Sequence, residues 1–261
     1  KCRVEGRSAS QAVVTAIGLD DTGHKRFLGV DCVDTESHAD WRAFLADLRA
    51  RGVAAGKDGV QLVVSDAHEG LRKAIAETFQ GAAWQRCVTH LMRDVVGHIH
   101  NKEGQGLARE AMRAAFAQKS PIVARACYQR AAEEVMKVSR TAGEVLLEAE
   151  EEALAYLAFP ASHRTKIRTN NVQERANREI KRRTGVVQGF PSRESLIRLV
   201  GAALIEADEE WSARCVISKP SLAHAWRREE RPAPDEASVL EARQVADRII
   251  STAIDPEEGQ G

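Results

Sequence analysis

Two strand-like stretches joined by a short turn most constrain the fold of this chain. Residues 10–19 read as one strand, Asp20-Asp21-Thr22-Gly23 is made of turn formers, and residues 25–33 read as the partner strand. Because a hairpin needs further elements to cover its apolar side chains, the first hundred residues are predicted to be α/β.

The next segments alternate between helix and strand. Residues 1–4 are predicted to end an earlier strand, and Ser37 is predicted to cap a helix that ends at Gly52. Residues 62–65 then read as a buried strand, 69–79 as a helix and 84–87 as a short strand, followed by a helix that contains Leu91, Val95 and Ile99. Periodicity alone supports a mixed α/β fold. The order of the elements is that of a ribonuclease H-like sheet.

Residues 102–159 are almost entirely helical in character and are interrupted at Pro121. We interpret them as an all-helical insertion into the sheet domain. Helices are predicted again over 171–181 and 193–211, with a turn at 189–191. The expected regions are 1–101 for the first part of the core, 102–159 for the insertion, 160–212 for the rest of the core and 213–261 for a hydrophilic C-terminal tail. Within the tail, Pro232 and Pro234 mark a linker, and an acidic helix over about 238–250 is predicted to be peripheral.

The composition, with 43% hydrophobic and 29% charged residues, is that of an ordinary soluble protein. There is no run of about 18 apolar residues and no signal-peptide pattern, so we expect a cytoplasmic protein that is not inserted in a membrane. The five cysteines are scattered without the spacing of a disulfide framework, which indicates reduced thiols.

The formal net charge is zero, but the charges are segregated along the chain. Residues 229–261 carry nine acidic residues against three arginines. Residues 164–183 carry eight cations against two glutamates, a local excess that predicts a phosphate-binding surface, although a solvated helix face remains the alternative. The eight candidate DNA-binding cations are Arg164, Lys166, Arg168, Arg175, Arg178, Lys181, Arg182 and Arg183.

Two carboxylates stand out by position. Asp66 sits at the polar end of the apolar run 62–65, and Glu174 sits within the basic helical segment. A carboxylate among cations is expected where it holds a hard divalent ion while the cations hold phosphates. The alternative is a strand-end aspartate that caps a helix and a glutamate that forms surface ion pairs.

Four stretches of the sequence, in order, match a known family. They are Glu36-Ser37 through Arg51-Gly52, Val64-Ser65-Asp66-Ala67-His68-Glu69-Gly70-Leu71, Trp84-Gln85-Arg86-Cys87-Val88-Thr89-His90, and Ile167-Arg168-Thr169 through Thr184. With these stretches, the chain resembles the catalytic region of Mutator-type bacterial insertion-sequence transposases, which belong to the DDE class, over roughly residues 1–212. It departs from the usual pattern of that family at Arg164, Asn170 and Gln173.

The resemblance implies a ribonuclease H-like core interrupted by a helical insertion. It also implies that Asp66 is the second catalytic acid and Glu174 the third, both of them ligands in a two-metal site for Mg²⁺ or Mn²⁺. The implied function is strand cleavage and strand transfer at insertion-sequence ends, with transposon and target DNA as partners and a homo-oligomer as the assembly. Glu179 competes with Glu174, but it lies about 140° further round a helix, so we prefer Glu174.

The resemblance puts the first catalytic aspartate on the first strand, a few residues before the position of Lys1. We therefore expect the chain to be N-terminally truncated relative to the family and inactive alone. Asp20, Asp21, Asp31 and Asp34 fall in a turn or in the third strand, and we do not expect them to replace it. The alternative function is that of an inactive remnant that binds only DNA or the full-length transposase.

Cys87-x-x-His90 matches a signature of the same family and is also half of a zinc site. No second Cys/His pair at ligand spacing is present in the sequence. We therefore expect Cys87 and His90 to have a structural role beside the active site.

Overall fold

The structure is a computed structural model that describes residues 1–4, 7–56, 58–225 and 233–255. The chain divides into two compact units, each assembled from segments far apart in the sequence. Unit 1 comprises Lys1–Val63, Ala67–Trp84 and Asn170–Arg228, whereas unit 2 comprises Val64–Asp66, Gln85–Thr169 and Glu229–Gly261. In the described residues, helices are joined to three two-stranded sheets, which confirms the predicted mixed α/β class.

The strands pair in sequence order. Strand β1 (Cys2–Val4) pairs antiparallel with β2 (Arg7–Ala9), and β3 (Ala12–Leu19) pairs antiparallel with β4 (Lys25–Val33), with a register shift after Ala16. Strand β5 (Leu62–Ser65) pairs with β6 (Ala83–Arg86), and both strands contribute their last two residues to unit 2. The hairpin predicted at the start of the chain is therefore confirmed as β3–β4, while β2 was not predicted.

The turn between β3 and β4 depends on a glycine. Gly23 has a φ of 85°, in the left-handed region that favours glycine. A Cβ atom at this position would lie 1.6 Å from the carbonyl oxygen of Ile217, which follows helix α10 (Arg193–Ser212). The backbone N–H of Val216 donates to the Gly23 carbonyl at 2.8 Å, so this turn also anchors the chain after α10.

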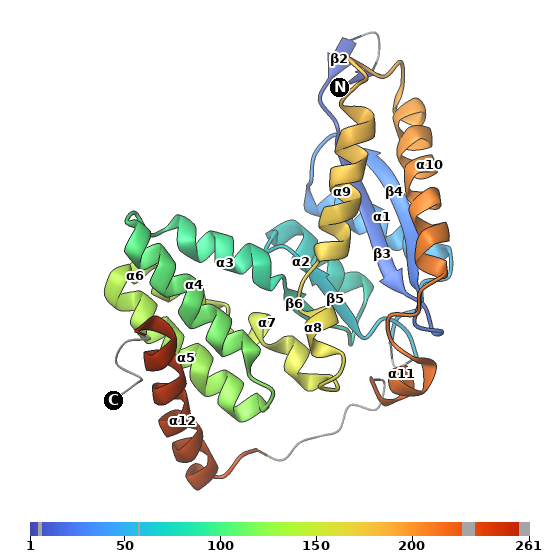
Figure 1. Ribbon diagram of the computed structural model, residues 1–261. Helices are drawn as coiled ribbons and strands as arrows, with labels where there is room; N and C mark the ends of the chain where they lie inside the picture. The colour runs from blue at the N-terminus through green and yellow to red at the C-terminus, as the bar shows by residue number, and fades with distance from the viewer. Residues whose placement is uncertain (5–6, 57, 226–232, 256–261) are drawn as a thin grey trace. The chain divides into compact units, whose positions relative to one another are not determined.

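The β3–β4 hairpin has one apolar cluster on each face, as side-chain alternation along a strand requires. Val13 and Ile17 join the cluster with helices α9 (Asn171–Thr184) and α10, which run along the hairpin in Figure 1. Val14 and Ala16 join the cluster with helices α1 (His38–Ala50) and α2 (Glu69–Thr78). Unit 1 is thus a strand pair with helices on both faces.

Helix α1 shows how the local sequence determines where a helix begins and which face it buries. Ser37 accepts a hydrogen bond from the Asp40 backbone N–H and the Asp40 side chain bonds back, which forms the predicted cap as a complete capping box. Phe44, Leu45 and Leu48 form its buried face, and each contributes about 1.5–3 kcal/mol relative to an exposed side chain.

Unit 2 is mainly helical. Its largest cluster draws on α3 (Val88–Gly97), α4 (Lys102–Ala117), α5 (Pro121–Val138) and α6 (Arg140–Glu148), and Pro121 begins α5 at a position where proline costs no hydrogen bond. Shorter helices follow: α7 (Glu150–Ala153), the 3₁₀ helix η1 (Ala155–Ala158) and α8 (Arg164–Ile167). In unit 1, helix α11 (Lys219–Ala225) follows α10.

The last helix, α12 (Glu236–Ile254), corrects the expectation of a peripheral helix. It packs on α4 and α5, and Ala242, Ala246 and Ile250 are buried in the main cluster of unit 2. Asp247 also forms an ion pair with Arg130 of α5 at 2.7 Å. The predicted linker residue Pro232 lies outside the described residues. Among the described helices, none has a long enough apolar stretch to cross a membrane.

A buried glutamine joins β6 to the helices of unit 2. The Gln85 side chain is fully buried, donates to the carbonyls of Arg86 (2.7 Å) and Ala153 (2.8 Å), and accepts from the Tyr156 N–H (2.8 Å). All three of these hydrogen bonds are made with backbone groups. Without Gln85, those backbone groups would lose these partners in the interior of the protein.

We expect Gln85→Ala to lower the free energy of unfolding of unit 2 by about 1–3 kcal/mol, the cost of leaving a buried polar group unsatisfied. Urea unfolding followed by far-UV circular dichroism measures this change. Gln118→Ala is the matched control, since Gln118 is only half-buried and bonds one carbonyl of its own helix. Equal costs for the two variants would show that Gln85 has no special role.

Candidate functional site

Asp66 directly follows β5, and β6 brings a second chain segment beside it. The backbone N–H of Cys87, which follows β6, donates to the carbonyl of Ser65, the last residue of β5, at 2.8 Å. This bond holds the ends of the two strands together. The Asp66 side chain is 52% exposed, so part of the carboxylate faces solvent. A strand end of this kind holds a side chain by its backbone while leaving it accessible to a ligand.

The predicted signature Cys87-x-x-His90 lies at this same strand end. Cys87 is the N-cap residue of α3 and is fully buried, and His90 lies in the first turn of the helix. His90 Nδ1 lies 2.7 Å from Asp66 Oδ1. Possible ligand atoms of Asp66, Cys87 and His90 all lie within 4.8 Å of one another. Unit 2 therefore brings together three of the residues that the sequence singled out.

Helix α3 is held at its first turn by contacts that sequence reasoning missed. The Val88 N–H donates to the Arg168 carbonyl at 3.1 Å, so the chain after α8 satisfies one of the free N–H groups at the helix start. Arg86, which precedes the helix, also pairs with Asp94 further along α3 at 2.6 Å. The contact between Val88 and Arg168 joins residues far apart in the sequence, and no local motif signals it.

Glu174 belongs to α9 in unit 1. Ala176 and Ile180 form the buried face of this helix, while Glu174 is half-buried. Gln173 donates to the Thr15 hydroxyl of β3 and to Asn177 at 3.2 Å. The residue before Glu174, where the chain departs from the resembling family, thus ties the first turn of α9 to the strand pair.

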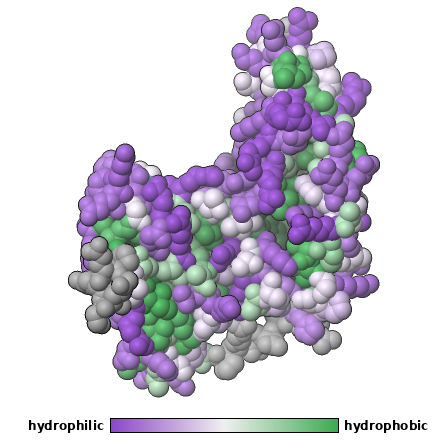
Figure 2. Space-filling model, in the orientation of Figure 1, coloured by the Kyte–Doolittle hydropathy of each residue, from purple (hydrophilic) through white to green (hydrophobic). Residues whose placement is uncertain are grey.

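The cations of α9 differ in how they are used. Arg175, Arg178 and Lys181 are exposed, and within the described part of the chain they form no ion pair. Hydrophilic residues cover α9 in the view of Figure 2. From the helix period, Arg178 and Lys181 lie about 40° and 20° round the axis from Glu174, so these three residues share the face opposite the buried one.

Arg182 and Arg183 are already paired within the protein. Arg182 bonds Glu179 at 2.7 and 2.9 Å, and Arg183 bonds Glu179 at 2.7 Å and Glu206 at 2.5 Å. The hydrogen bonds from Arg182 and Arg183 lower the pKa of Glu179 to about 2. Glu179 is therefore an ion-pair residue here.

Two of the predicted DNA-binding cations point into unit 2. Arg164 is only 6% exposed, and its guanidinium donates to the carbonyls of Phe159 (2.9 Å), Lys119 (2.5 Å) and Leu157 (3.0 Å). Arg168 donates to the Phe116 carbonyl and lies over the Tyr156 ring. Lys166, by contrast, is exposed. The hydrogen bonds of Arg164 and Arg168 are therefore directed at backbone carbonyls of unit 2.

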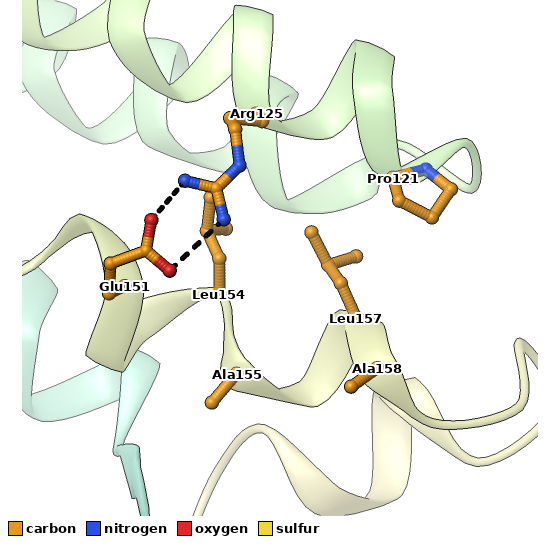
Figure 3. Close-up of a pocket in the computed structure, with 7 residues that line it drawn as sticks. All are labelled: Pro121, Arg125, Glu151, Leu154, Ala155, Leu157 and Ala158. Atoms are coloured by element: carbon orange, nitrogen blue, oxygen red, sulfur yellow. Dashed lines mark hydrogen bonds and ion pairs between the residues drawn. The ribbon is translucent and has the colours of Figure 1, made fainter. Parts of the chain in front are cut away.

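A shallow cavity of about 270 Å³ lies in unit 2 between α5 and the segment from α7 to η1. Arg125 and Glu151 form an ion pair across its edge, and apolar side chains such as Leu154 and Leu157 form its floor (Figure 3). None of the residues predicted to carry chemistry lines it. The cavity is therefore not a candidate active site.

The two predicted carboxylates, Asp66 and Glu174, suit a hard divalent cation better than the cluster of Asp66, Cys87 and His90 does. Mg²⁺ binds oxygen ligands and uses few carboxylates together with water and substrate oxygens. Asp66 supplies such oxygens, whereas the buried Cys87 thiol is a soft ligand that suits zinc or copper. Glu174 is the second carboxylate of the predicted metal site, and it belongs to the other unit.

Comparisons with known proteins agree with the motif pattern. The model of the family described as "Transposase, Mutator family" matches residues 1–214. The transposase for insertion sequence element IS406 of Burkholderia multivorans is 36% identical over 211 residues, which cover 81% of this chain and 53% of the relative. The IS1081 transposase of Mycobacterium tuberculosis is 39% identical over 81% of this chain and 50% of the relative. The IS256 transposase of Staphylococcus aureus is 32% identical over 81% of this chain and 53% of the relative. The chain spans about half the length of the curated relatives it matches.

Proposed function

The chain belongs to the Mutator family of transposases, and from this premise we propose that it is part of the catalytic region of an insertion-sequence transposase. The proposed reaction is metal-dependent phosphoryl transfer of the DDE class, which cleaves DNA at transposon ends and joins it to target DNA. The observation that carries the proposal is the exposed Asp66 carboxylate at the end of β5, with His90 Nδ1 2.7 Å away. The proposal includes a ribonuclease H-like core, a homo-oligomer and a cytoplasmic location.

In this proposal, Asp66 and Glu174 hold Mg²⁺ or Mn²⁺. Two such ions, when bound, activate the attacking hydroxyl and stabilise the leaving oxygen of an in-line displacement. Arg178 and Lys181, which share the outer face of α9 with Glu174, hold DNA phosphates on either side of the scissile bond. The protein forms no covalent intermediate with DNA, because water or a DNA 3′-hydroxyl is the nucleophile.

The first carboxylate of the class is proposed to lie before the position of Lys1 in a longer protein. Two carboxylates are few for a pair of ions, since each ion needs several oxygen ligands. The direct test is to add an upstream strand with the aspartate and to assay Mg²⁺-dependent cleavage of insertion-sequence ends. Cleavage by the longer form supports the enzyme. DNA binding without cleavage in that form would favour the alternative, an inactive remnant.

DNA contact by α9 makes a separate prediction for the chain as it stands. Binding is expected to be weak, largely independent of sequence and steeply dependent on salt, because phosphate contacts release counterions. The double variant Arg178→Ala, Lys181→Ala should flatten the slope of log K against log salt by up to about two units, about 0.9 for each lost contact. Fluorescence anisotropy titrations at several salt concentrations measure this slope.

The double variant Arg182→Ala, Arg183→Ala is the matched control on the same helix. Because Glu179 and Glu206 already neutralise these arginines, their loss should change the slope less than the loss of Arg178 and Lys181. An unchanged slope in the first double variant would mean that its cations form only a solvated helix face.

A further inference from the structure

Three groups that can ligate metals meet at the end of β5: Asp66, Cys87 and His90, all in unit 2. Two arrangements would bring them together. They could share one ion, or the Cys-x-x-His segment could hold the aspartate in place for an ion that Asp66 binds without the other two. The distances between the three side chains, and their burial, distinguish these two arrangements.

The distance between Asp66 and His90 favours direct contact over a shared ion. Their Oδ1 and Nδ1 atoms are 2.7 Å apart, a close polar contact in which the N–H direction does not meet the angle of a hydrogen bond. Two ligands at about 2.0–2.1 Å from one tetrahedral zinc would lie about 3.3 Å apart. His90 Nδ1 is itself buried from solvent, and Cys87 is 0% exposed. The geometry is that of an imidazole placed against a carboxylate, with a packed thiol beside them.

The three-residue spacing of the signature produces this contact. Cys87 is the N-cap of α3, so His90 is the third residue of the helix. Side chains at that position characteristically reach back toward the N-cap. The bond from the Cys87 N–H to the Ser65 carbonyl places the N-cap beside the start of the Asp66 segment. His90 therefore reaches back across the strand end and meets Asp66.

We propose, from the close contact of Nδ1 with Oδ1, that His90 is a positioning residue that holds the Asp66 carboxylate in its metal-binding orientation, with Nδ1–H turning to donate to the carboxylate when a metal ion binds. The inference rests on the proposed function, since it takes Asp66 as a metal ligand. A partner that orients a ligating carboxylate typically changes metal affinity 10–100-fold. The role requires only a proton on Nδ1, so it does not depend on the charge of the ring.

The test uses Mn²⁺ binding to the 261-residue chain, followed by paramagnetic broadening of the amide signals beside Asp66. Asp66→Asn should abolish the local broadening, and His90→Ala should weaken Mn²⁺ binding about 10–100-fold. Asn can place its amide nitrogen near the position of Nδ1, whereas Gln reaches toward the position of Nε2. His90→Asn should therefore keep most of the affinity, and His90→Gln should behave like His90→Ala.

A second measurement reads the contact without metal. In ¹⁵N spectra of the histidine rings, His90 should carry its proton on Nδ1, and Asp66→Ala should release that preference. A ring protonated only on Nε2, an unchanged Mn²⁺ affinity in His90→Ala, or equal losses in His90→Asn and His90→Gln would each overturn the positioning role. So would zinc binding that Cys87→Ser abolishes.

The outcomes also separate this inference from the proposed function. If Asp66→Asn leaves Mn²⁺ binding intact, or if the wild-type chain shows no local broadening, Asp66 is not the ligand and the catalytic proposal loses its main support. If Asp66→Asn abolishes binding while His90→Ala does not weaken it, only the positioning role fails.

Discussion

Asp66→Asn or Glu174→Gln is expected to abolish Mg²⁺-dependent strand cleavage in a longer form that carries the upstream aspartate. A metal ion supplies several kcal/mol of charge stabilisation in the transition state, so the loss should be roughly a thousand-fold or more at 1.36 kcal/mol for each factor of ten. The circular-dichroism spectrum should not change, because both substitutions conserve side-chain size and neither side chain is fully buried.

The chain offers a matched control for each substitution. Asp58→Asn changes an exposed aspartate in a loop of unit 1, and Glu179→Gln changes the neighbouring glutamate of α9. Both should retain cleavage, although Glu179→Gln also removes the partner of Arg182 and Arg183. Substantial cleavage by Asp66→Asn or Glu174→Gln, or an equal loss in Glu179→Gln, would contradict the assignment of the two acids.

Ile250→Ala is expected to lower the stability of unit 2 by about 2–5 kcal/mol, the usual cost of removing a fully buried isoleucine side chain down to Cβ. Ile250 is 0% exposed within the main cluster. Such a loss is a large part of the 5–15 kcal/mol that stabilises a typical domain. Leu240→Ala is the control, because Leu240 lies on the same helix but is 59% exposed, and it should cost less than about 0.5 kcal/mol.

Two spectroscopic probes can localise the effect of Ile250→Ala. The tryptophans of the described residues, Trp41, Trp84 and Trp211, belong to unit 1, whereas circular dichroism senses the helices of both units. In urea, the variant should lose part of its dichroism at a lower concentration than wild type, while the midpoint of tryptophan fluorescence stays unchanged. Identical curves for the Ile250 and Leu240 variants would show that α12 does not stabilise unit 2.

Much of the local structure could be predicted because the signals are local. The stretch 25–33, read as the partner strand after the turn at 20–23, and the apolar run 62–65 predict β4 and β5 with their observed bounds. Ser37 marks the start of α1 because its hydroxyl can satisfy a free N–H group of the first turn. The resemblance in motifs led to the family, which the comparisons confirm.

What could not be predicted depends on contacts between distant residues. The acidic composition of the last helix suggested a peripheral location, yet Ala242, Ala246 and Ile250 form a narrow apolar stripe at helical spacing that suffices to bury one face. Counting charges placed Arg164 on a DNA surface, although three backbone carbonyls take its donors. The meeting of Asp66 and His90 likewise requires the pairing of β5 with β6.

The place of α12 in the core of unit 2 has a consequence for how the chain folds during synthesis. Helices α3–α6 leave the ribosome long before their last partner, since α12 begins about 70 residues after Thr169. At a translation rate of roughly 5–20 residues per second, the apolar surface that later packs against α12 stays exposed for several seconds. During that interval the nascent bundle is a natural client for chaperones, and unit 2 is completed only after α12 has been synthesised.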